Sequence, residues 1–588
     1  MIETMRTLRA AIVGALARRL DPARRERRAR RAVRCVASGL LCAVSLSACQ
    51  AVPGAGPVRE GLENLSQGEQ RVQFNPGGPM NDATQEQIVR GFVRAATSSV
   101  DDYRVAREFL TPEYAALWEP DDGVFVDEGT QPYRTVAEDV GQLSVSGLAT
   151  VDALGTLTPL KPGPPTVMRF EFAEVDGQWR IASAPSGVIL DRTSFSAVWA
   201  KVQLYFVTPD ERLVSEPRWF LNGSTLSTQI VNALIAGPTE TSGSALRTAF
   251  PRGSALSTSA VPVNGGVARI EFTPEILTSE SQNLDLIHQQ IAASLQSVPD
   301  VNSFEISVNG SVVDSGSVLV QESPVRSTEN LVTTVLREGE LGALSAGKIT
   351  SLPRIGERIA RLRPNAVALA ADRRSAAIRH RSDGRSTVSW VSESEVVALD
   401  VRAGLFEPSL DRFGYVWSYA TSQPAGMLVQ LPGGEAQFLN LPGLAGGAPV
   451  AIRVSPGGDR LAILTRSDTE TTTVITVSIV RDQNSQPVAL APFAVTELIV
   501  PGTAVDVDWV DEQRVVALSR SGPAVRVTIS SLGGLPADAG VVANAVAVSG
   551  GGSRALIRVL DRSGRLYAPL GSGWQWQSDD VTLIARSG

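Results

Sequence analysis

The sequence has very few of the residues on which metal and nucleophilic chemistry depend. Its 588 residues include only three cysteines, Cys35, Cys42 and Cys49, all near the start of the chain. The two histidines, His288 and His380, are far apart in the sequence. A Ser-His-Asp site therefore has almost no candidates, and no Cys/His spacing suits a metal ion. The sequence predicts no catalytic residue, no metal site and no cofactor.

Common enzyme motifs are missing as well. The chain has no Gly-x-Ser-x-Gly turn, no P-loop and no Gly-x-Gly-x-x-Gly after a predicted strand. Asp506, Asp508 and Asp511 resemble a calcium loop only loosely, because the expected glycine and final glutamate are absent. We interpret these three acids as turn residues. The sequence therefore favours a protein that is not an enzyme.

Lysine is also scarce, and arginine is concentrated at the start of the chain. Residues 1–34 contain eleven arginines and three acidic residues. Without residues 1–48 the chain keeps 43 basic and 58 acidic residues, a net charge near −15. Such an acidic surface argues against binding to nucleic acid and against electrostatic adsorption to anionic lipid.

An uncharged apolar run over residues 35–48 follows the basic segment. It is too short for a membrane-spanning helix, which needs about 20 residues. Leu46-Ser47-Ala48-Cys49 matches a lipobox, at which a lipid is attached to the cysteine and the chain is cut before it. We predict a lipoprotein signal peptide over residues 1–48 and lipidation of Cys49. An ordinary secretory signal and an uncleaved anchor are the alternatives, but neither needs a cysteine there.

Residues 49–81 are rich in glycine, proline and polar residues and show no apolar period. As a flexible tether they would hold the first domain on the order of 30 Å from the membrane. We therefore expect the protein on the outer, extracytoplasmic face of the cell membrane, anchored in the bilayer through acylated Cys49.

Helical and then strand-like patterns predict an α+β domain over residues 82–195. Apolar residues repeat with a helical period near residue 90, and strand patterns follow. Asp176-Gly177 separates two alternating runs, which is a strong hairpin signal. We predict a curved sheet covered by helices, similar to the cone-like cystatin and nuclear-transport-factor folds.

Residues 196–320 alternate between strands and helices. The helix predicted over residues 283–296 has one apolar stripe. The ordered runs LYFVTPDERLV, IVNALIAGPT, LRTAFPRGSAL and VARIEF resemble the GerMN module, an α/β interaction domain of cell-envelope lipoproteins. His288 lies beside the apolar stripe, and we interpret it as structural.

After a connection predicted over residues 321–350, residues 351–588 read as strands and turns. A strand-turn-strand phrase recurs five times, with spacings of 39, 46, 54 and 40 residues between its turns. Such periods predict a β-propeller, here with five or six blades. A β-sandwich is the alternative. The turns are marked by Asp372, Asp411, Gly457, Asp511 and Gly551.

One segment between residues 352 and 385 is strongly basic within this acidic chain. It carries nine arginines against three acidic residues. Such a charge run indicates either a docking patch or a solvated blade edge. The candidate partner-binding residues are Arg354, Arg358, Arg373, Arg374 and Arg381.

The order of lipobox, α+β domain, GerMN module and propeller resembles the LpqB family of lipoproteins of high-GC Gram-positive bacteria. The resemblance implies that the protein binds the extracytoplasmic sensor region of the histidine kinase MtrB. It also implies an effect on signalling to the regulator MtrA, and so on cell-wall homeostasis and division. The alternative is a protein that binds or hydrolyses cell-wall saccharides in the propeller channel.

Overall fold

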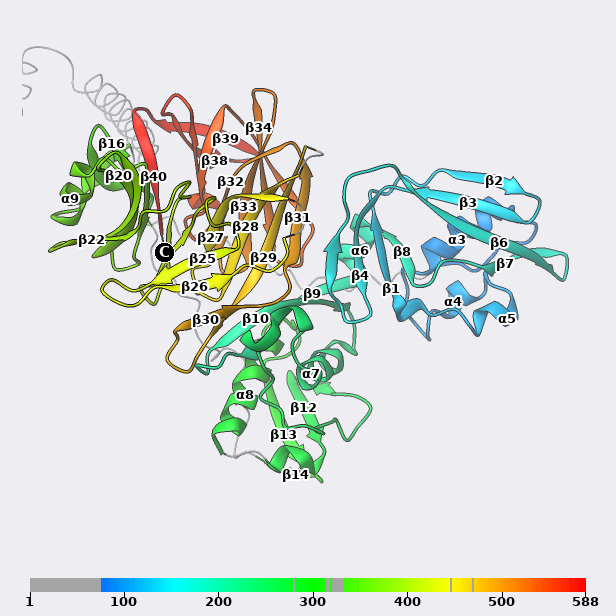
Figure 1. Cartoon of the computed structure of the whole chain (residues 1–588). Coiled ribbons are helices and arrows are strands. Elements are labelled where there is room, and N and C mark those ends of the chain that lie inside the picture. The colour runs from blue at the N-terminus through cyan, green and yellow to red at the C-terminus, as the bar shows by residue number, and fades with distance from the viewer. Residues whose placement is uncertain are drawn as a thin grey trace, which may run out of the picture. The chain divides into compact units, whose positions relative to one another are not determined.

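The computed structural model describes residues 76–278, 281–313, 318–319, 332–345, 347–444, 447–467 and 470–587, which belong to one compact unit. Three folded parts follow one another along the chain: a mixed α+β domain, an α/β domain and a domain built largely of strands (Figure 1). Among the described residues, no helix is both long and apolar enough to cross a bilayer.

Helix α3 (Gln85–Ala95) opens the first domain and is fixed by a capping box. The Thr84 hydroxyl accepts a hydrogen bond from the Gln87 backbone N–H, and the Gln87 side chain accepts one from the Thr84 N–H, at 3.3 and 2.8 Å. One face of α3 is buried in the domain core. The other helices are α4 (Arg104–Arg107), α5 (Pro112–Ala115), a 3-10 turn (Pro120–Asp122) and α6 (Arg192–Val198).

Two four-stranded sheets complete this domain, in the orders β2-β3-β6-β7 and β5-β4-β1-β8. Asp176 and Gly177 join β6 to β7 with positive φ angles of 51° and 70°, as a type I′ hairpin turn requires. The strands are β1 (Gly123–Asp127), β2 (Tyr133–Ala137), β3 (Val140–Val145), β4 (Gly147–Asp152), β5 (Leu157–Pro159), β6 (Thr166–Val175), β7 (Gln178–Ser183) and β8 (Val188–Asp191).

The second domain begins with a long hairpin, β9 (Trp199–Val207) and β10 (Leu213–Leu221). Helix α8 (Ser281–Leu295) joins the parallel strands β12 (Val267–Phe272) and β13 (Ser303–Val308), because a parallel pair needs such a crossover. The remaining elements are α7 (Leu226–Ala236), β11 (Val263–Asn264), β14 (Ser311–Val312), β15 (Val318–Leu319) and 3-10 turns at Glu240–Ala245 and Pro274–Thr278.

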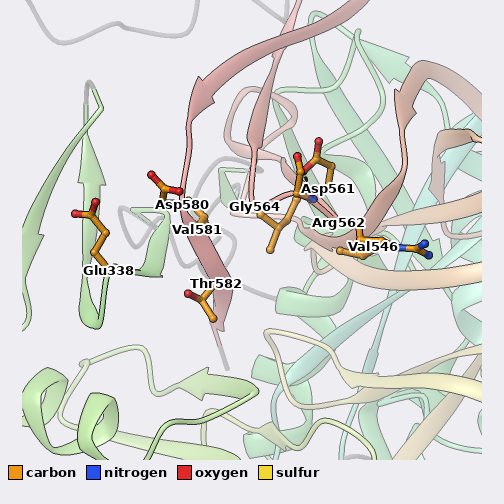
Figure 2. A pocket seen from close by; sticks show the side chains of 10 residues that line it. Glu338, Val546, Asp561, Arg562, Gly564, Asp580, Val581 and Thr582 are labelled. Carbon is orange, nitrogen blue, oxygen red and sulfur yellow. Dashed lines mark hydrogen bonds between the residues drawn. The ribbon is translucent and has the colours of Figure 1, made fainter.

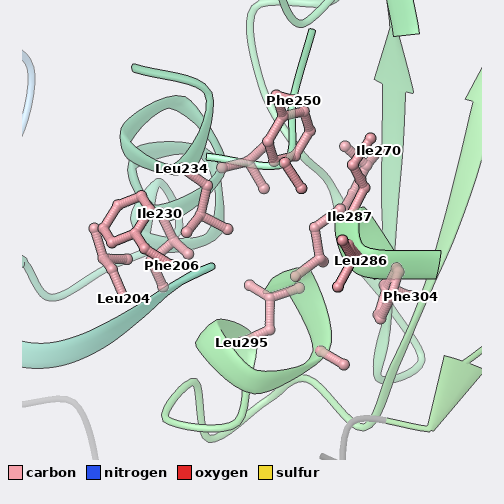
Figure 3. Close-up of a cluster of buried hydrophobic side chains, with 14 of the residues drawn as sticks. Leu204, Phe206, Ile230, Leu234, Phe250, Ile270, Leu286, Ile287, Leu295 and Phe304 are labelled. Carbon is pink, nitrogen blue, oxygen red and sulfur yellow. The ribbon is translucent and has the colours of Figure 1, made fainter. Parts of the chain in front are cut away.

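The core of this domain lies between the hairpin, the two helices and the β12–β13 pair (Figure 3). The stripe predicted on α8 supplies Ile287, Ile291 and Leu295, whose side chains are fully buried. Each such side chain stabilises the fold by about 1.5–3 kcal/mol. The structure therefore confirms the predicted GerMN-like α/β domain.

The C-terminal domain is a propeller of six blades. The first strands of successive blades, β19, β23, β27, β32, β36 and β40, each contact the next, and β40 returns to β19. This closed ring of contacts confirms the propeller over the sandwich. Five blades begin with the recurring strand-turn-strand phrase. The remaining blade combines β40 with β16, β17 and β18.

The blades are named here by their order around the ring. Blade 1 holds β16 (Thr334–Arg337), β17 (Glu340–Ser345), β18 (Lys348–Ser351) and β40 (Val581–Ser587). Blade 2 holds β19 (Ala366–Leu369), β20 (Ser375–Ser382), β21 (Arg385–Ser392) and β22 (Val396–Asp400). Blade 3 holds β23 (Ser409–Leu410), β24 (Val416–Tyr419), β25 (Gly426–Gln430) and β26 (Gln437–Asn440).

Blade 4 holds β27 (Ala448–Val454), β28 (Arg460–Arg466), β29 (Thr471–Arg481), β30 (Pro487–Leu490) and β31 (Val495–Pro501). Blade 5 holds β32 (Thr503–Asp511), β33 (Arg514–Ser521), β34 (Ala524–Ser531) and β35 (Ala537–Ala543). Blade 6 holds β36 (Ala545–Ser549), β37 (Arg558–Asp561), β38 (Leu566–Leu570) and β39 (Gly573–Ser578).

The sequence predicted a connection over residues 321–350, but the structure places strands of blade 1 there. Strands β16 and β17 lie in that stretch, and β16 pairs antiparallel with β40 from the far end of the chain. The propeller therefore begins before residue 351. Helix α9 (Ile355–Arg361) joins blade 1 to blade 2.

Candidate functional site

Charged side chains from four blades meet where the first strands of the blades converge. Arg453 lies on β27, Asp506 on β32 and Arg586 on β40, while Glu407 precedes β23. Because these strands surround the propeller axis, we call the four residues the axis cluster.

The axis cluster alternates acids and arginines. One guanidinium nitrogen of Arg453 lies 2.7 Å from Glu407 Oε2 and 3.0 Å from Asp506 Oδ1. Arg586 donates to Asp506 Oδ2 at 2.5 Å and also to Glu407. Arg453, Asp506 and Arg586 are buried, and the Glu407 side chain is 29% exposed. Each acid therefore contacts both arginines, and these contacts connect four blades.

The pKa values of the carboxyl groups follow from these contacts. Burial would raise the pKa of Glu407, but the positive charges of Arg586, Arg453 and Arg379 outweigh it and lower that pKa to about 2. Asp508 is buried nearby on β32 and accepts a hydrogen bond from the Gly550 N–H at 3.0 Å. Burial raises the pKa of Asp508, and its neighbouring arginines only partly offset this.

From the sequence we interpreted Asp506 and Asp508 as turn residues. The structure corrects this, because both lie within strand β32. Only Asp511, which ends the strand, holds a turn, where its Oδ1 accepts the Gln513 N–H at 2.9 Å. Hydrolysis of a glycoside needs one acid and one free base or nucleophile on either side of the substrate. In the axis cluster Glu407 and Asp506 each contact two arginines. The part of the chain that the structure describes contains no His/Cys/Asp/Glu group suited to a metal ion.

The five arginines proposed to bind a partner do not form one patch. Arg373 and Arg374 lie in the β19–β20 turn, whereas Arg381 is the penultimate residue of β20, beside the β20–β21 turn. Successive turns of an antiparallel meander lie at opposite ends of the blade. The seven residue-to-residue steps from Arg374 to Arg381 span about 23 Å of extended strand.

Arg354 and Arg358 lie at the same end of blade 2 as Arg373 and Arg374. Arg354 forms an ion pair of 3.2 Å with Glu393 in the β21–β22 turn, and Arg358 donates to the Glu393 carbonyl at 2.9 Å. The Arg354 side chain remains 76% exposed. The structure therefore brings four of the five residues to one end of the blade and separates Arg381 from them.

Both histidines lie among packed side chains. His380 is buried on β20, and its Nε2 is 2.9 Å from Ser389 Oγ. Burial lowers the pKa of His380. The His288 ring lies 6.1 Å from the Phe304 ring on the GerMN-like domain. Cys49 and the signal peptide lie outside the described residues, so lipidation stays a prediction.

A surface hollow of about 780 Å³ lies where blade 6 meets blade 1 (Figure 2). Its acids come from three separate segments: Glu338 after β16, Asp561 at the end of β37 and Asp580 before β40. Asp561 is buried and accepts the N–H groups of Ser563 and Arg565 at 2.8 and 2.9 Å. That carboxylate is therefore occupied in shaping its own turn.

Three sequence families match the chain in the order of its folded parts. "Lipoprotein LpqB, N-terminal domain" matches residues 78–196, and "Sporulation and spore germination" (Germane) matches residues 203–314. "Lipoprotein LpqB beta-propeller domain" matches residues 339–582, which includes β17 and β18 of blade 1.

Relatives named Lipoprotein LpqB align with large parts of the chain. The Streptomyces coelicolor protein is 26% identical over 93% of this chain and 96% of its own length. The Thermobifida fusca and Bifidobacterium longum proteins are 28% and 31% identical, and these matches span only about half of the relatives, 53% and 48%. Because the matched domains follow one another in the order of the described fold, the chain belongs to the LpqB family of lipoproteins.

Proposed function

We propose that this protein is a lipid-anchored accessory of a two-component system on the outer face of the cell membrane. It binds the extracytoplasmic sensor region of an MtrB-like histidine kinase and modulates phosphorylation of an MtrA-like regulator. Through this regulator it affects cell-wall homeostasis and division. Acylated Cys49 holds it in the bilayer, and it acts without a cofactor and without binding nucleic acid.

Membership of the LpqB family is the observation that carries this proposal, because the kinase partner comes from that resemblance. The axis cluster supports a binding role over a catalytic one. Glu407 and Asp506 each contact two arginines, so neither is available as a free base or nucleophile. A rigid scaffold of two or more domains presents broad surfaces, which suits recognition of another protein.

Binding or hydrolysis of cell-wall saccharides in the propeller channel is the rival function. Hydrolysis by Glu407 or Asp506 would require that a sugar displace their arginines, which would leave buried charges without partners. Buried polar groups without partners cost free energy, so this displacement opposes saccharide entry. The axis cluster therefore favours the binding role.

Crosslinking in intact cells tests the proposal. The full-length lipoprotein carries a photo-crosslinking residue at exposed Arg374 in one strain and at exposed Arg385, at the other end of blade 2, in a second. We expect an MtrB-like kinase among the crosslinked membrane proteins. Capture of cell-wall glycan without any kinase, from both positions, would favour the rival function.

A further inference from the structure

The β9–β10 hairpin of the GerMN-like domain contacts the propeller at both its tip and its base. At the tip, Arg212 donates two hydrogen bonds to Asp459 in the β27–β28 turn, at 3.1 and 2.7 Å. Its Nε also donates to Asp210 at 2.8 Å, and Ser485 of the propeller donates to the same Asp210 at 2.6 Å. A guanidinium that meets a carboxylate through two parallel hydrogen bonds is among the stronger and more directional polar contacts.

An aromatic ring of blade 3 supports the same arginine. The guanidinium carbon of Arg212 lies 5.0 Å from the centre of the Phe413 ring, and that of Arg481 lies 4.3 Å from it. Arg481 is buried and forms a 2.6 Å ion pair with buried Asp411. Arg212 therefore contacts propeller side chains that also contact one another. Cation–π attraction to Phe413 adds to the ion pair of Arg212 with Asp459.

The base of the hairpin contacts the last residue of β34 and the loop that follows this strand. The indole N–H of Trp219 donates to the Gly533 carbonyl at 2.7 Å, and Lys201 Nζ donates to Ser531 Oγ at 2.6 Å. Gly533 has a φ of 56°, and a Cβ there would lie 2.7 Å from Pro217 of β10. The close approach of the Pro217 ring to the Gly533 backbone, together with the positive φ, favours glycine in the loop.

Apolar packing connects the polar contacts. Val480 of β29 is buried in the same hydrophobic cluster as the GerMN-like core, and Ala489 of β30 packs against that cluster. Two separated polar anchors with apolar packing between them resist both rotation and sliding of one domain on the other.

We infer that the β9–β10 hairpin is an internal latch that holds the GerMN-like domain and the propeller as one rigid body. The latch comprises Asp210, Arg212, Lys201 and Trp219 on the hairpin and their partners on the propeller. This inference does not depend on the proposed kinase partner. It means that any partner meets a fixed surface composed of both domains, and that the propeller face under the latch is already occupied by this chain.

Distance measurement between two spin labels tests the latch. The mature chain that begins at residue 49 has no cysteine once Cys49→Ser is introduced, so labels can be placed freely. Asn264→Cys on the GerMN-like domain and Glu435→Cys on blade 3 are both exposed. We expect one narrow distance distribution in the otherwise unchanged protein, and a broad one when Arg212→Ala and Trp219→Ala are added.

The matched control is Arg526→Ala, which removes an exposed ion pair with Asp538 on blade 5, away from the latch. This variant should keep the narrow distribution. Arg212→Lys, which keeps the charge but loses the two-pronged contact, is the second latch variant if the double variant does not fold. A broad distribution in the unchanged protein, or an unaltered narrow one in the folded latch variants, would overturn the inference.

Discussion

Two carboxyl groups near the propeller axis respond to pH in opposite directions. Neighbouring arginines lower the pKa of Glu407 to about 2, while a glutamate in the unfolded chain has a pKa of about 4.3. Glu407 therefore contributes its full stabilisation at pH values above its pKa in the unfolded chain. This contribution is lost as the pH falls towards and through its pKa in the folded chain. Burial raises the pKa of Asp508, so its ionised form is less stable in the folded than in the unfolded chain at neutral pH.

Glu407→Gln should lower the free energy of unfolding at pH 7 by about 2–3 kcal/mol, because it leaves two arginines short of a partner. This loss of stability is smaller than for a fully buried ion pair, because the Glu407 side chain is 29% exposed. Urea unfolding between pH 7 and pH 3 measures it, and the difference from the unchanged protein should shrink as the pH falls. Asp508→Asn is the control with the opposite sign, since it should be neutral or stabilising at pH 7. A Glu407→Gln loss that is equal at both pH values would contradict this account.

The arginines at one end of blade 2 are the candidate docking patch. Changing Arg373 and Arg374 together to glutamate should slow association with an acidic sensor region, and the effect should weaken as salt screens the charges. Stopped-flow association at several salt concentrations measures it. Changing Arg381 and Arg385 to glutamate alters net charge equally at the opposite end and serves as the control. Equal slowing by both pairs would show that net charge, and not this end of the blade, governs the encounter.

Cys49→Ser should release the protein from membranes, because without the thiol no lipid can be attached there. Immunoblotting of membrane and soluble fractions measures the release. A peripheral protein held by charge should leave the membrane in a high-salt wash, whereas the unchanged lipoprotein should remain. If the serine variant also remains with membranes after that wash, the anchor lies elsewhere in the chain.

Sequence reasoning about individual residues succeeded only where neighbours in the chain were enough. Asp176-Gly177 predicted its hairpin because both strands adjoin it. The axis cluster was missed, because its four residues are scattered between positions 407 and 586. A signal existed for two of them, because Arg453 and Arg586 interrupt strands that are otherwise largely apolar. The basic segment shows the converse, since Arg374 and Arg381 are close in sequence but lie at opposite ends of β20.

At the scale of elements, β40 decides whether the propeller closes. It pairs with β16 on one side and with β19 on the other, and its Arg586 reaches the acids of two further blades. The five recurring phrases were predictable because each is a local hairpin. Blade 1 was not, because its strands come from the two ends of the domain and only tertiary pairing joins them.

Deletion of residues 581–587 should therefore destabilise the whole propeller, and not only blade 1. Each blade buries its faces on its neighbours, so an open ring exposes apolar surface on both sides of the gap. Differential scanning calorimetry measures the loss as a lower midpoint and a less cooperative transition. Deletion of the described tether residues 76–81 is a control of similar length that should leave the midpoint unchanged. Unaltered unfolding after loss of β40 would argue against closure by this strand.

At the scale of the whole molecule, an α+β domain, a GerMN-like domain and a propeller follow one another, and we infer that the latch holds the last two together. The order of the domains was predictable from the sequence, because each has its own local pattern. The latch was not, since contacts such as Arg212 with Asp459 depend on how folded surfaces meet.

Direct binding is the measurement that tests the central claim most closely. The soluble mature protein carrying Cys49→Ser is titrated by isothermal calorimetry into the purified extracytoplasmic region of the MtrB-like kinase from the same organism. We expect saturable binding with a defined stoichiometry, and no heat of turnover when cell-wall fragments replace the kinase. Absence of binding to the kinase region together with sustained hydrolysis of those fragments would contradict it.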